Sequence, residues 1–411
     1  MAVIRPFCAV RPAVEYADKV AALPYDVYNR AEAKKEVERE PLSFLAIDRA
    51  ETQFEDSVSV YAPEVYAKAK ELFEERISQG IFVEDKQSAY YIYQLEMNGR
   101  TQTGIAACAS VDDYLDGTIK KHENTREEKE QDRIRHVDTL SAQTGPIFLA
   151  YRSQATINQL VSEIMETQEP LYDFTAADGI AHRMWKVTEE AVTTLQEAFA
   201  GIQEIYIADG HHRAASAVKV GLKRRKEHPD YDGTEEFNYF LSVLFPDDQL
   251  MIMDYNRCVK DLHGLTKEAF LKAVEECFDV TVLDGAKHPQ VKGQITMYLE
   301  NRWYLLQAKQ ELLAITDPVA ALDVSLLQEY LLKPVLGIED PRTDERIDFI
   351  GGIRGLEELE RRVQTDMTVA FAMYPTSIGE LFAVADAGLL MPPKSTWFEP
   401  KLRSGLLMHR I

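Results

Sequence analysis

The sequence has few cysteines and no motif that would pair them or bind a metal through them. Its 411 residues include four cysteines that lie far apart: Cys8, Cys108, Cys258 and Cys277. No C-x-x-C pair occurs, so the pattern excludes a zinc knuckle and a disulfide framework. A Walker A motif, a glycine-rich dinucleotide fingerprint, G-x-S-x-G and H-E-x-x-H are also absent, which removes the commonest nucleotide-binding, hydrolase and metalloprotease signatures.

Long apolar runs and an excess of positive charge are missing as well. No stretch approaches 18 consecutive apolar residues, and Arg5 and Pro6 occupy the place where a signal peptide has its apolar run. We therefore expect no membrane segment and a cytoplasmic protein. The chain has 46 Lys+Arg against 68 Asp+Glu, a net charge of −22, which argues against nucleic acid as a partner. Any phosphate that it handles is expected to be small and held in a locally basic pocket.

Helical and extended patterns alternate along the chain. Residues 62–80 have the pattern of an amphipathic helix, and Asn98-Gly99 separates two strand-like runs, which predicts a hairpin. A short apolar strand is predicted over residues 204–208, and after residue 256 the alternation begins again. The patterns predict an α/β protein, with α+β as the alternative, whose mixed sheets are flanked by helices. The length favours more than one domain, and we place them at residues 1–260 and 261–411.

The most informative motif is Asp209-Gly210-His211-His212-Arg213, where a predicted strand ends and an alanine-rich helix begins. Glycine permits a tight turn, and the first turn of a helix presents unpaired N–H groups that suit an anion. Arg213 adds a fork of donors for phosphate, while His211 and His212 can donate or accept near neutral pH. Asp209 could take a proton from a hydroxyl or bind Mg²⁺. The simpler alternative is that Asp209 caps the helix and both histidines lie on its surface.

A second candidate is the highly charged, proline-free segment 120–140, which predicts one long helix. Helical spacing would place five basic side chains on one stripe: His122, Arg126, Lys129, Arg133 and His136. This stripe is a candidate phosphate contact, and Glu123 beside it is a candidate base or metal ligand. A solvated helix with i,i+4 ion pairs explains the same pattern equally well.

Two weaker signals complete the candidate site. Asp26 follows a proline-fixed turn near the start of the chain, where a structural turn is the alternative. Lys394 belongs to a group of cations and hydroxyls beside aromatic residues near the C-terminus, and we include it as a candidate phosphate ligand.

The sequence resembles a bacterial family catalogued as domain of unknown function 1015. The resemblance runs nearly end to end and is carried by these motifs: Arg5-Pro-Phe, Pro24-Tyr-Asp-Val, His122-Glu-x-Thr-Arg with Asp132-Arg133 and His136, Ala208-Asp-Gly-His-His-Arg, Tyr255-Asn-Arg257, Pro393-Lys-Ser-Thr and Glu399-Pro-Lys-Leu. Together these motifs are specific for the family.

The turn at Asp209 in addition resembles the phosphate-binding turn of the ParB/sulfiredoxin superfamily, which includes nucleotide-dependent free-serine kinases. This resemblance implies a ParB/sulfiredoxin-like core in the first domain, followed by a C-terminal α/β domain. It also implies ATP or another nucleotide with Mg²⁺ as cofactors. The expected partners are that nucleotide and a small-molecule substrate, with a homo-oligomer left open.

Carried over residue by residue, the resemblance places Asp209 near the reacting hydroxyl or the metal, and His211, His212 and Arg213 on the transferred phosphate. The family's separate carboxylate base has two candidates here, Asp26 and Glu123. We therefore expect a phosphotransferase that acts on a small hydroxyl-bearing metabolite, with free serine as one acceptor.

Two alternatives belong to other classes. A ParB-like switch would bind nucleotide with slow turnover or none, and the only basic run after the turn, residues 223–226, is short for such a role. A metal-dependent hydrolase would use the histidines of both candidate segments, His122, His136, His211 and His212.

Overall fold

The computed structural model describes residues 1–411, and the chain forms two compact units. Unit 1 comprises Met1–Leu250 and Pro400–Ile411, and unit 2 comprises Met251–Glu399. The predicted division lies between residues 260 and 261 and gives the C-terminal segment to the second domain, so the structure differs at both points. The end of the chain returns to unit 1 because residues 408–410 form a strand between two strands of its smaller sheet.

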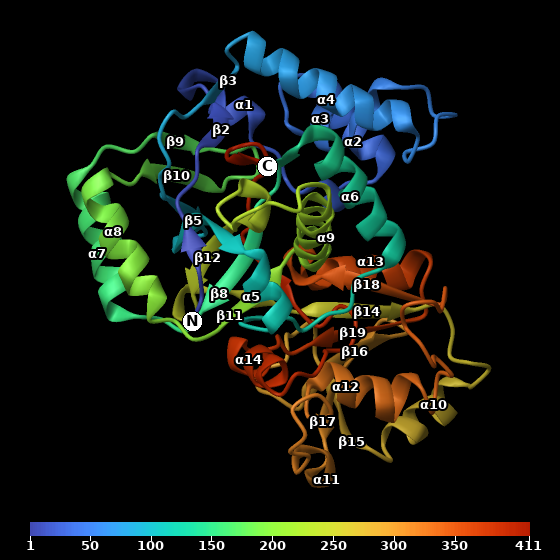
Figure 1. Ribbon diagram of the computed structural model, residues 1–411. Helices are drawn as coiled ribbons and strands as arrows, with labels where there is room; N and C mark the ends of the chain where they lie inside the picture. Colours follow the sequence, from blue (N-terminus) through green and yellow to red (C-terminus); the bar gives the residue numbers. More distant parts are fainter. The chain divides into compact units, whose positions relative to one another are not determined.

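Unit 1 is built around a nine-stranded mixed sheet (Figure 1). Its strands, in spatial order, are β6 (Ile119–Lys120), β11 (Ile205–Asp209), β8 (Ile147–Tyr151), β12 (Tyr239–Pro246), β5 (Arg100–Ser110), β4 (Tyr91–Met97), β10 (Ala181–Lys186) and β9 (Tyr172–Thr175), with β1 (Ile4–Arg5) paired to β5. The pairs β11–β6 and β12–β8 are parallel and the others are antiparallel. The central strands β8 and β12 are almost wholly buried, as expected for strands that are covered on both faces.

A four-stranded antiparallel sheet lies in the same unit. Its order is β3 (Phe82–Glu84), β2 (Ala9–Pro12), β21 (Met408–Arg410) and β7 (Ala142–Gln143). The α-helices of unit 1 are α1 (Ala17–Val20), α2 (Arg30–Arg39), α3 (Leu45–Asp48), α4 (Pro63–Ser78), α5 (Val111–Asp116), α6 (Glu127–Leu140), α7 (Ala155–Thr167), α8 (Glu189–Ala200) and α9 (His211–Glu227). Helix α7 buries Ile157, Val161 and Ile164, one apolar stripe at helical spacing, against the sheet.

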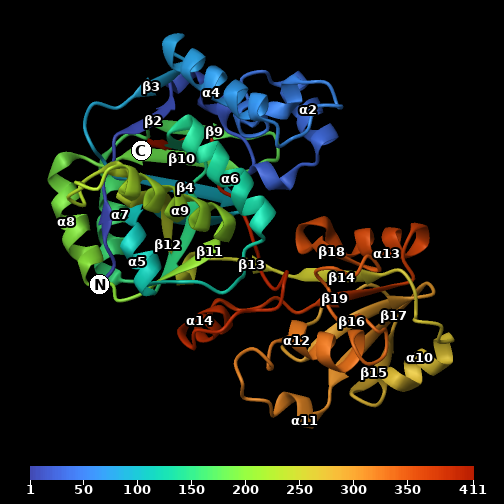
Figure 2. The same ribbon diagram turned by 45° about the vertical axis from the view of Figure 1, so that its right-hand side comes forward.

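Unit 2 has a six-stranded antiparallel sheet with helices. Its strands, in spatial order, are β15 (Phe278–Leu283), β17 (Arg302–Ala308), β16 (Gln294–Leu299), β19 (Val369–Met373), β14 (Tyr255–Val259) and β18 (Ile347–Gly351). The remaining elements are α10 (Lys267–Val274), α11 (Gln310–Leu313), α12 (Asp323–Leu327), α13 (Gly355–Thr365), α14 (Ile378–Asp386) and the pair β13 (Ile252–Met253) with β20 (Trp397–Phe398). Helix α13 packs on β19 (Figure 2).

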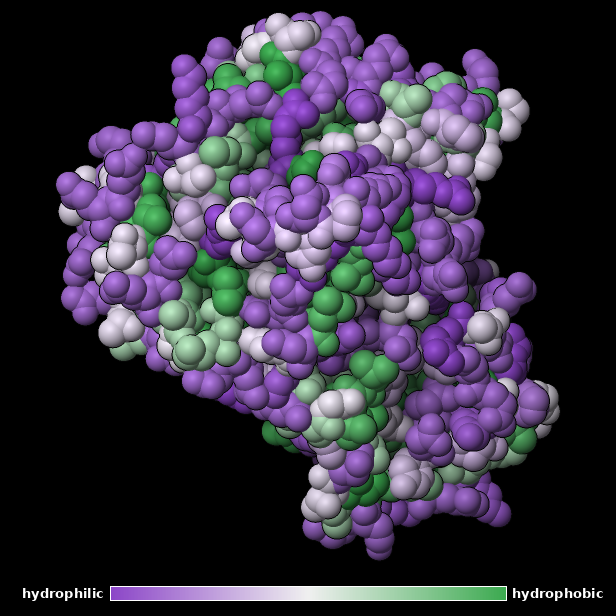
Figure 3. Space-filling model, in the orientation of Figure 1, coloured by the Kyte–Doolittle hydropathy of each residue, from purple (hydrophilic) through white to green (hydrophobic).

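The predicted class, α/β with mixed sheets and flanking helices, is confirmed. The predicted helix over residues 62–80 is α4, and Asn98-Gly99 closes the hairpin of β4 and β5 with Met97 opposite Arg100. No helix of the structure is long and apolar enough to cross a membrane. Hydrophilic side chains cover most of the face in Figure 3, as the strongly charged composition leads one to expect.

The prediction of one helix over 120–140 is wrong for its first third. Helix α6 begins at Glu127, and Arg126 before it has an extended backbone with φ −93° and ψ 128°. The backbone N–H groups of His122 and Arg126 are bonded to side chains of α9, so tertiary contacts hold this segment out of the helix. Glu127, Glu128 and Glu130 fill the first turn, where acidic side chains favour a helix start.

The C-terminal segment provides a test of the fold. Gly405 has φ +84°, and a Cβ there would lie 2.5 Å from Cβ of the buried Phe44. We expect Gly405→Ala to lower the free energy of unfolding by about 2–5 kcal/mol, since it combines left-handed strain with overpacking. Gly99→Ala is the matched control, because Gly99 has φ +76° with nothing within 4 Å of the added atom. Denaturant unfolding measures both, and equal losses would contradict the packing argument.

Candidate functional site

The turn between β11 and α9 has the geometry that its sequence predicts. Gly210 has φ 95° and ψ 33°, a left-handed conformation that turns the strand into the helix. A Cβ at Gly210 would lie 3.0 Å from two guanidinium nitrogens of Arg213, so the arginine folds back over the glycine. The turn therefore requires glycine both for its backbone angle and for the space that Arg213 fills.

Arg213 joins the turn to a pocket. Its Nη2 lies 3.3 Å from Oδ2 of Asp209, and its Nη1 donates to the carbonyl of Pro146. The same carboxylate oxygen of Asp209 lies 3.6 Å from Nζ of Lys401. Asp209 thus lies between two cations. Lys401 was not among the predicted site residues, although the motif Glu399-Pro-Lys-Leu contains it.

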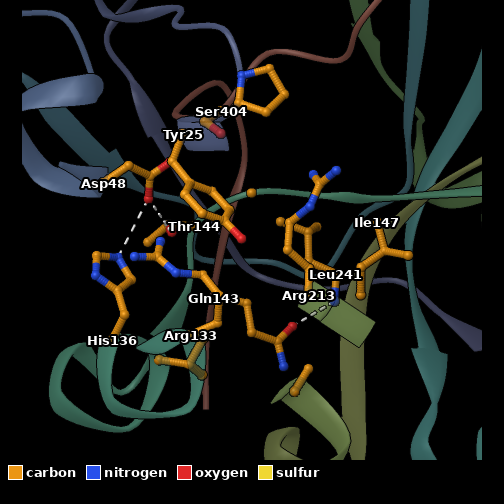
Figure 4. Close-up of a pocket in the computed structure, with 14 residues that line it drawn as sticks. Tyr25, Asp48, Arg133, His136, Gln143, Thr144, Ile147, Arg213, Leu241 and Ser404 are labelled. Carbon is orange, nitrogen blue, oxygen red and sulfur yellow. Dashed lines mark hydrogen bonds and ion pairs between the residues drawn. The ribbon is translucent and has the colours of Figure 1, made fainter. Parts of the chain in front are cut away.

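Two adjoining pockets share part of their lining, and the smaller one includes Arg213 of this turn. The smaller encloses about 470 Å³, and Arg213 and Arg133 both line it. The larger has a volume of about 750 Å³. Its lining includes Asp26, Lys129 and Asp132, which do not line the smaller pocket. Both pockets are lined by the same four side chains, which are Tyr25, Asp48, Arg133 and His136. Figure 4 shows the residues of the smaller pocket, with the guanidinium of Arg133 on the side of Asp48 and His136 and that of Arg213 on the opposite side.

Arg133 is a buried cation whose neighbours keep it charged. Its Nη2 lies 2.8 Å from Oδ2 of Asp132, and its guanidinium carbon lies 4.0 Å from the ring centre of Tyr25. Burial opposes the charge, but Asp132, Tyr25 and Asp48 raise the pKa of Arg133 above its ordinary value. The pocket therefore has a permanent positive charge at its wall, which suits a phosphate or carboxylate ligand.

His122 and His211 form a buried pair beside the turn. Their rings are perpendicular with centres 4.4 Å apart, and the backbone N–H of His122 lies 3.4 Å from Nε2 of His211, its acceptor. Burial first, and then the neighbouring histidine, lowers the pKa of His122 to about 3. Burial also lowers the pKa of His211 to about 3, although Asp209 opposes the change. Both rings are therefore neutral at physiological pH, and neither supplies positive charge to a phosphate.

His212 connects the remaining candidates. Its Nε2 accepts the backbone N–H of Arg126 at 2.9 Å. Burial and the charge of Lys129 lower its pKa, while Glu123 and Asp26 oppose the change. The structure therefore brings Asp26, Glu123, Lys129 and the turn into one neighbourhood, although they come from three separate parts of the sequence.

The predicted basic stripe does not exist as one face. His122 is buried against His211, because the segment before Glu127 is not helical. Arg133 and His136 are buried toward Asp48, whereas Arg126 and Lys129 are exposed. Lys394 belongs to unit 2, where its ammonium lies 5.4 Å from the ring centre of Tyr255, and its phosphate contact stays a prediction.

No observation in the structure favours the ParB-like switch or the metal-dependent hydrolase. The basic run 223–226 is engaged in ion pairs, since Lys223 and Arg224 bind Asp138 and Arg225 binds Asp112. No group of three or more His, Cys, Asp or Glu side chains is placed to hold a metal ion. The four histidines of the hydrolase hypothesis thus form no metal centre of this kind.

The neutral histidines predict a measurable pH dependence of stability. Because the pKa of His211 is about 3 when folded and 6.5 ordinarily, the unfolded chain binds more protons between these values. The free energy of unfolding should therefore fall as pH falls from 6.5 toward 3, by up to about 1.4 kcal/mol per pH unit for this group. His211→Gln cannot titrate and should flatten the dependence, whereas His288→Ala at an exposed site should not. Unfolding curves across this range that are parallel for wild type and His211→Gln would contradict the burial argument.

Three solved structures match this chain weakly and share little sequence with it. A free serine kinase in complex with AMP is 14% identical, with 73% of this chain and 91% of that chain covered and a TM-score of 0.36. A conserved hypothetical protein from Pyrococcus furiosus is 15% identical, with 74% and 94% covered and a TM-score of 0.36. SbnI with a C-terminal truncation, from Staphylococcus aureus, is 11% identical, with 73% and 87% covered and a TM-score of 0.39. Similarity at this level does not extend to activity.

No curated protein matches the sequence. A family model does match, over residues 4–325, a range that contains the Asp209 turn and helix α6. The chain therefore belongs to the family described as protein of unknown function DUF1015.

Proposed function

We propose that this protein transfers a phosphoryl group from a nucleotide to a small hydroxyl-bearing metabolite, with free serine as the first acceptor to test. The observation that carries the proposal is the position of Arg213 and Arg133 on the wall of one pocket, directly beside the first turn of α9. Phosphoryl transfer needs positioned positive charge more than covalent help, and this pocket supplies it in a protein of charge −22.

The residues divide into those that would touch phosphate and those that support them. Arg213, Arg133 and the backbone of Gly210 would bind the phosphates of the nucleotide. The buried neutral rings of His122 and His211 would fix the segment 121–126 against the turn. Arg126 and Lys129 are exposed beside His212 and would add charge at the entrance.

The positive charge of this pocket suits ATP or another nucleotide. For Mg²⁺ the site offers few carboxylate ligands. Mg²⁺ is usually held by one or two carboxylates together with the phosphates of the substrate. Asp209 and Glu123 are the carboxylates beside the turn that could take this part, and Asp209 is now paired with Arg213 and Lys401. We therefore propose that they hold Mg²⁺ only with the nucleotide, whose charge such an ion would neutralise.

The first test is nucleotide binding. ATP, ADP, CTP and GTP with Mg²⁺ should each be screened for a rise in melting temperature, which reports binding to the folded state. Removing a charged hydrogen bond costs about 1.5–3 kcal/mol, so Arg213→Ala should weaken the binding of the active nucleotide by about 10–100-fold. Arg224→Ala, at the other end of the same helix and paired with Asp138, is the matched control. No shift with any nucleotide would refute the proposal.

The second test is turnover. Phosphate transfer to L-serine and other hydroxyl acceptors should be followed with the nucleotide that binds. Asp209→Asn keeps the volume of the side chain but removes the charge that would hold Mg²⁺, and we expect it to remain folded while kcat falls by about 10²–10⁴-fold. Full activity of this variant would remove Asp209 from the mechanism.

A further inference from the structure

A buried carboxylate outside the predicted site residues, Asp48, lines both pockets. Asp48 ends the short helix α3, all four residues of which are buried. Its Oδ1 accepts the hydroxyl of Thr144 at 2.9 Å and lies 3.4 Å from Nε2 of His136. Figure 4 shows His136 and Thr144 directed at this carboxylate. His136 is itself 3% exposed, so both members of the pair are removed from bulk water.

Asp48 is held in its charged form. Burial alone would raise its pKa, but His136, Arg133 and Thr144 together hold the pKa below its ordinary value. An ionised carboxylate costs free energy in such a place unless its neighbours compensate. Oδ1 of Asp48 already accepts the hydroxyl of Thr144 and lies at ion-pair distance from Nε2 of His136, which makes no hydrogen bond. Asp48 is therefore a poor base, but its charge faces the imidazole.

His136 lies where the pair that it forms with Asp48 could take part in the reaction. It lines the smaller pocket together with Arg213 and the larger pocket together with Asp26 and Lys129. A phosphate held by Arg213 and a hydroxyl compound in the larger pocket would therefore meet at the wall to which His136 belongs. A base for the acceptor hydroxyl is needed at this wall.

We propose that His136 is the general base of the reaction and that Asp48 is its positioning residue. This inference rests on the proposed phosphoryl transfer. The neutral imidazole, whose Nε2 faces Asp48, takes the proton of the acceptor hydroxyl on Nδ1 as that oxygen bonds to the terminal phosphorus of the nucleotide. The bond from phosphorus to the bridging oxygen breaks, and its electron pair leaves with the nucleoside diphosphate. Asp48 stabilises the resulting imidazolium, which then releases its proton to solvent.

The carboxylates that the sequence favours as bases are placed less well for this step. Asp209 is paired with two cations, which weakens it as a proton acceptor. Asp26 is exposed to water, and Glu123 lies beside His211, away from the wall that both pockets share. His136 in contrast is enclosed there and oriented by a charged partner.

The test uses the full chain, the nucleotide found by the thermal-shift screen, and L-serine as acceptor, replaced by another acceptor if the wild type uses that one. His136→Ala should lower kcat by about 10²–10⁴-fold while nucleotide binding persists. Added imidazole should restore part of kcat in this variant. A purely structural role of His136 would not produce such rescue. His288→Ala, at an exposed site in unit 2, is the matched control and should show neither loss nor rescue.

Two further variants separate the roles. His136→Gln keeps a polar atom near Asp48 but cannot take the proton, so it should lose kcat as His136→Ala does. Asp48→Asn should lower kcat with little change in KM, and in the double variant with His136→Ala it should weaken the rescue by imidazole. An active wild type with undiminished kcat in His136→Gln, or with no imidazole rescue of a folded His136→Ala, would overturn the inference alone. A wild type without turnover on any acceptor would overturn the proposed function as well.

Discussion

The backbone of Gly210 and the side chain of Arg213 depend on each other. The left-handed angle at Gly210 turns β11 into α9, and the missing side chain leaves the space over which the guanidinium lies. Arg213 then bonds to Asp209 before the turn and to Pro146, which precedes β8. One arginine thereby joins the end of β11, the start of α9 and the chain entering β8, and the same arginine lines the smaller pocket. The position of the candidate site in the sheet follows from this contact.

Neutral histidines hold the second part of the site against the first. The rings of His211 and His212 accept backbone N–H groups from His122 and Arg126, and an imidazole can accept only when its nitrogen is unprotonated. Burial keeps them in that form. The histidines next to the predicted phosphate site are thus structural, because their neutral rings accept backbone hydrogen bonds. The positive charge of the site comes from its arginines and lysines.

Features set by neighbouring residues could be predicted from the sequence. Features set by contacts between distant residues could not. The strand-to-helix turn at Asp209 and the hairpin at Asn98-Gly99 have short-range signals, and the structure has both. The start of α6 could not be predicted from 120–140 alone, because it is set by hydrogen bonds to α9. Asp48 had no signal at all, since nothing in the apolar sequence around it indicates that His136 and Thr144 will meet it. Lys401 belongs to a motif that could have drawn attention to it, but only the fold shows that its ammonium lies near Asp209.

The two arginines of the smaller pocket differ in the exposure of their carboxylate partners. In the pair of Arg213 with Asp209, the carboxylate is 35% exposed and the guanidinium 12%. Water therefore reaches Asp209, which can exchange its partner for a cation, while Arg213 also donates to the carbonyl of Pro146 and stays in place. Arg133 and Asp132 are 9% and 14% exposed, and Asp132 is further bound by the hydroxyl of Tyr66 at 2.8 Å. Separating that pair would strand charges in a poorly solvated place, so Arg133 keeps its partner and presents a fixed charge. The pocket thus presents two held cations, and of their carboxylate partners Asp209 is the one that water reaches more easily.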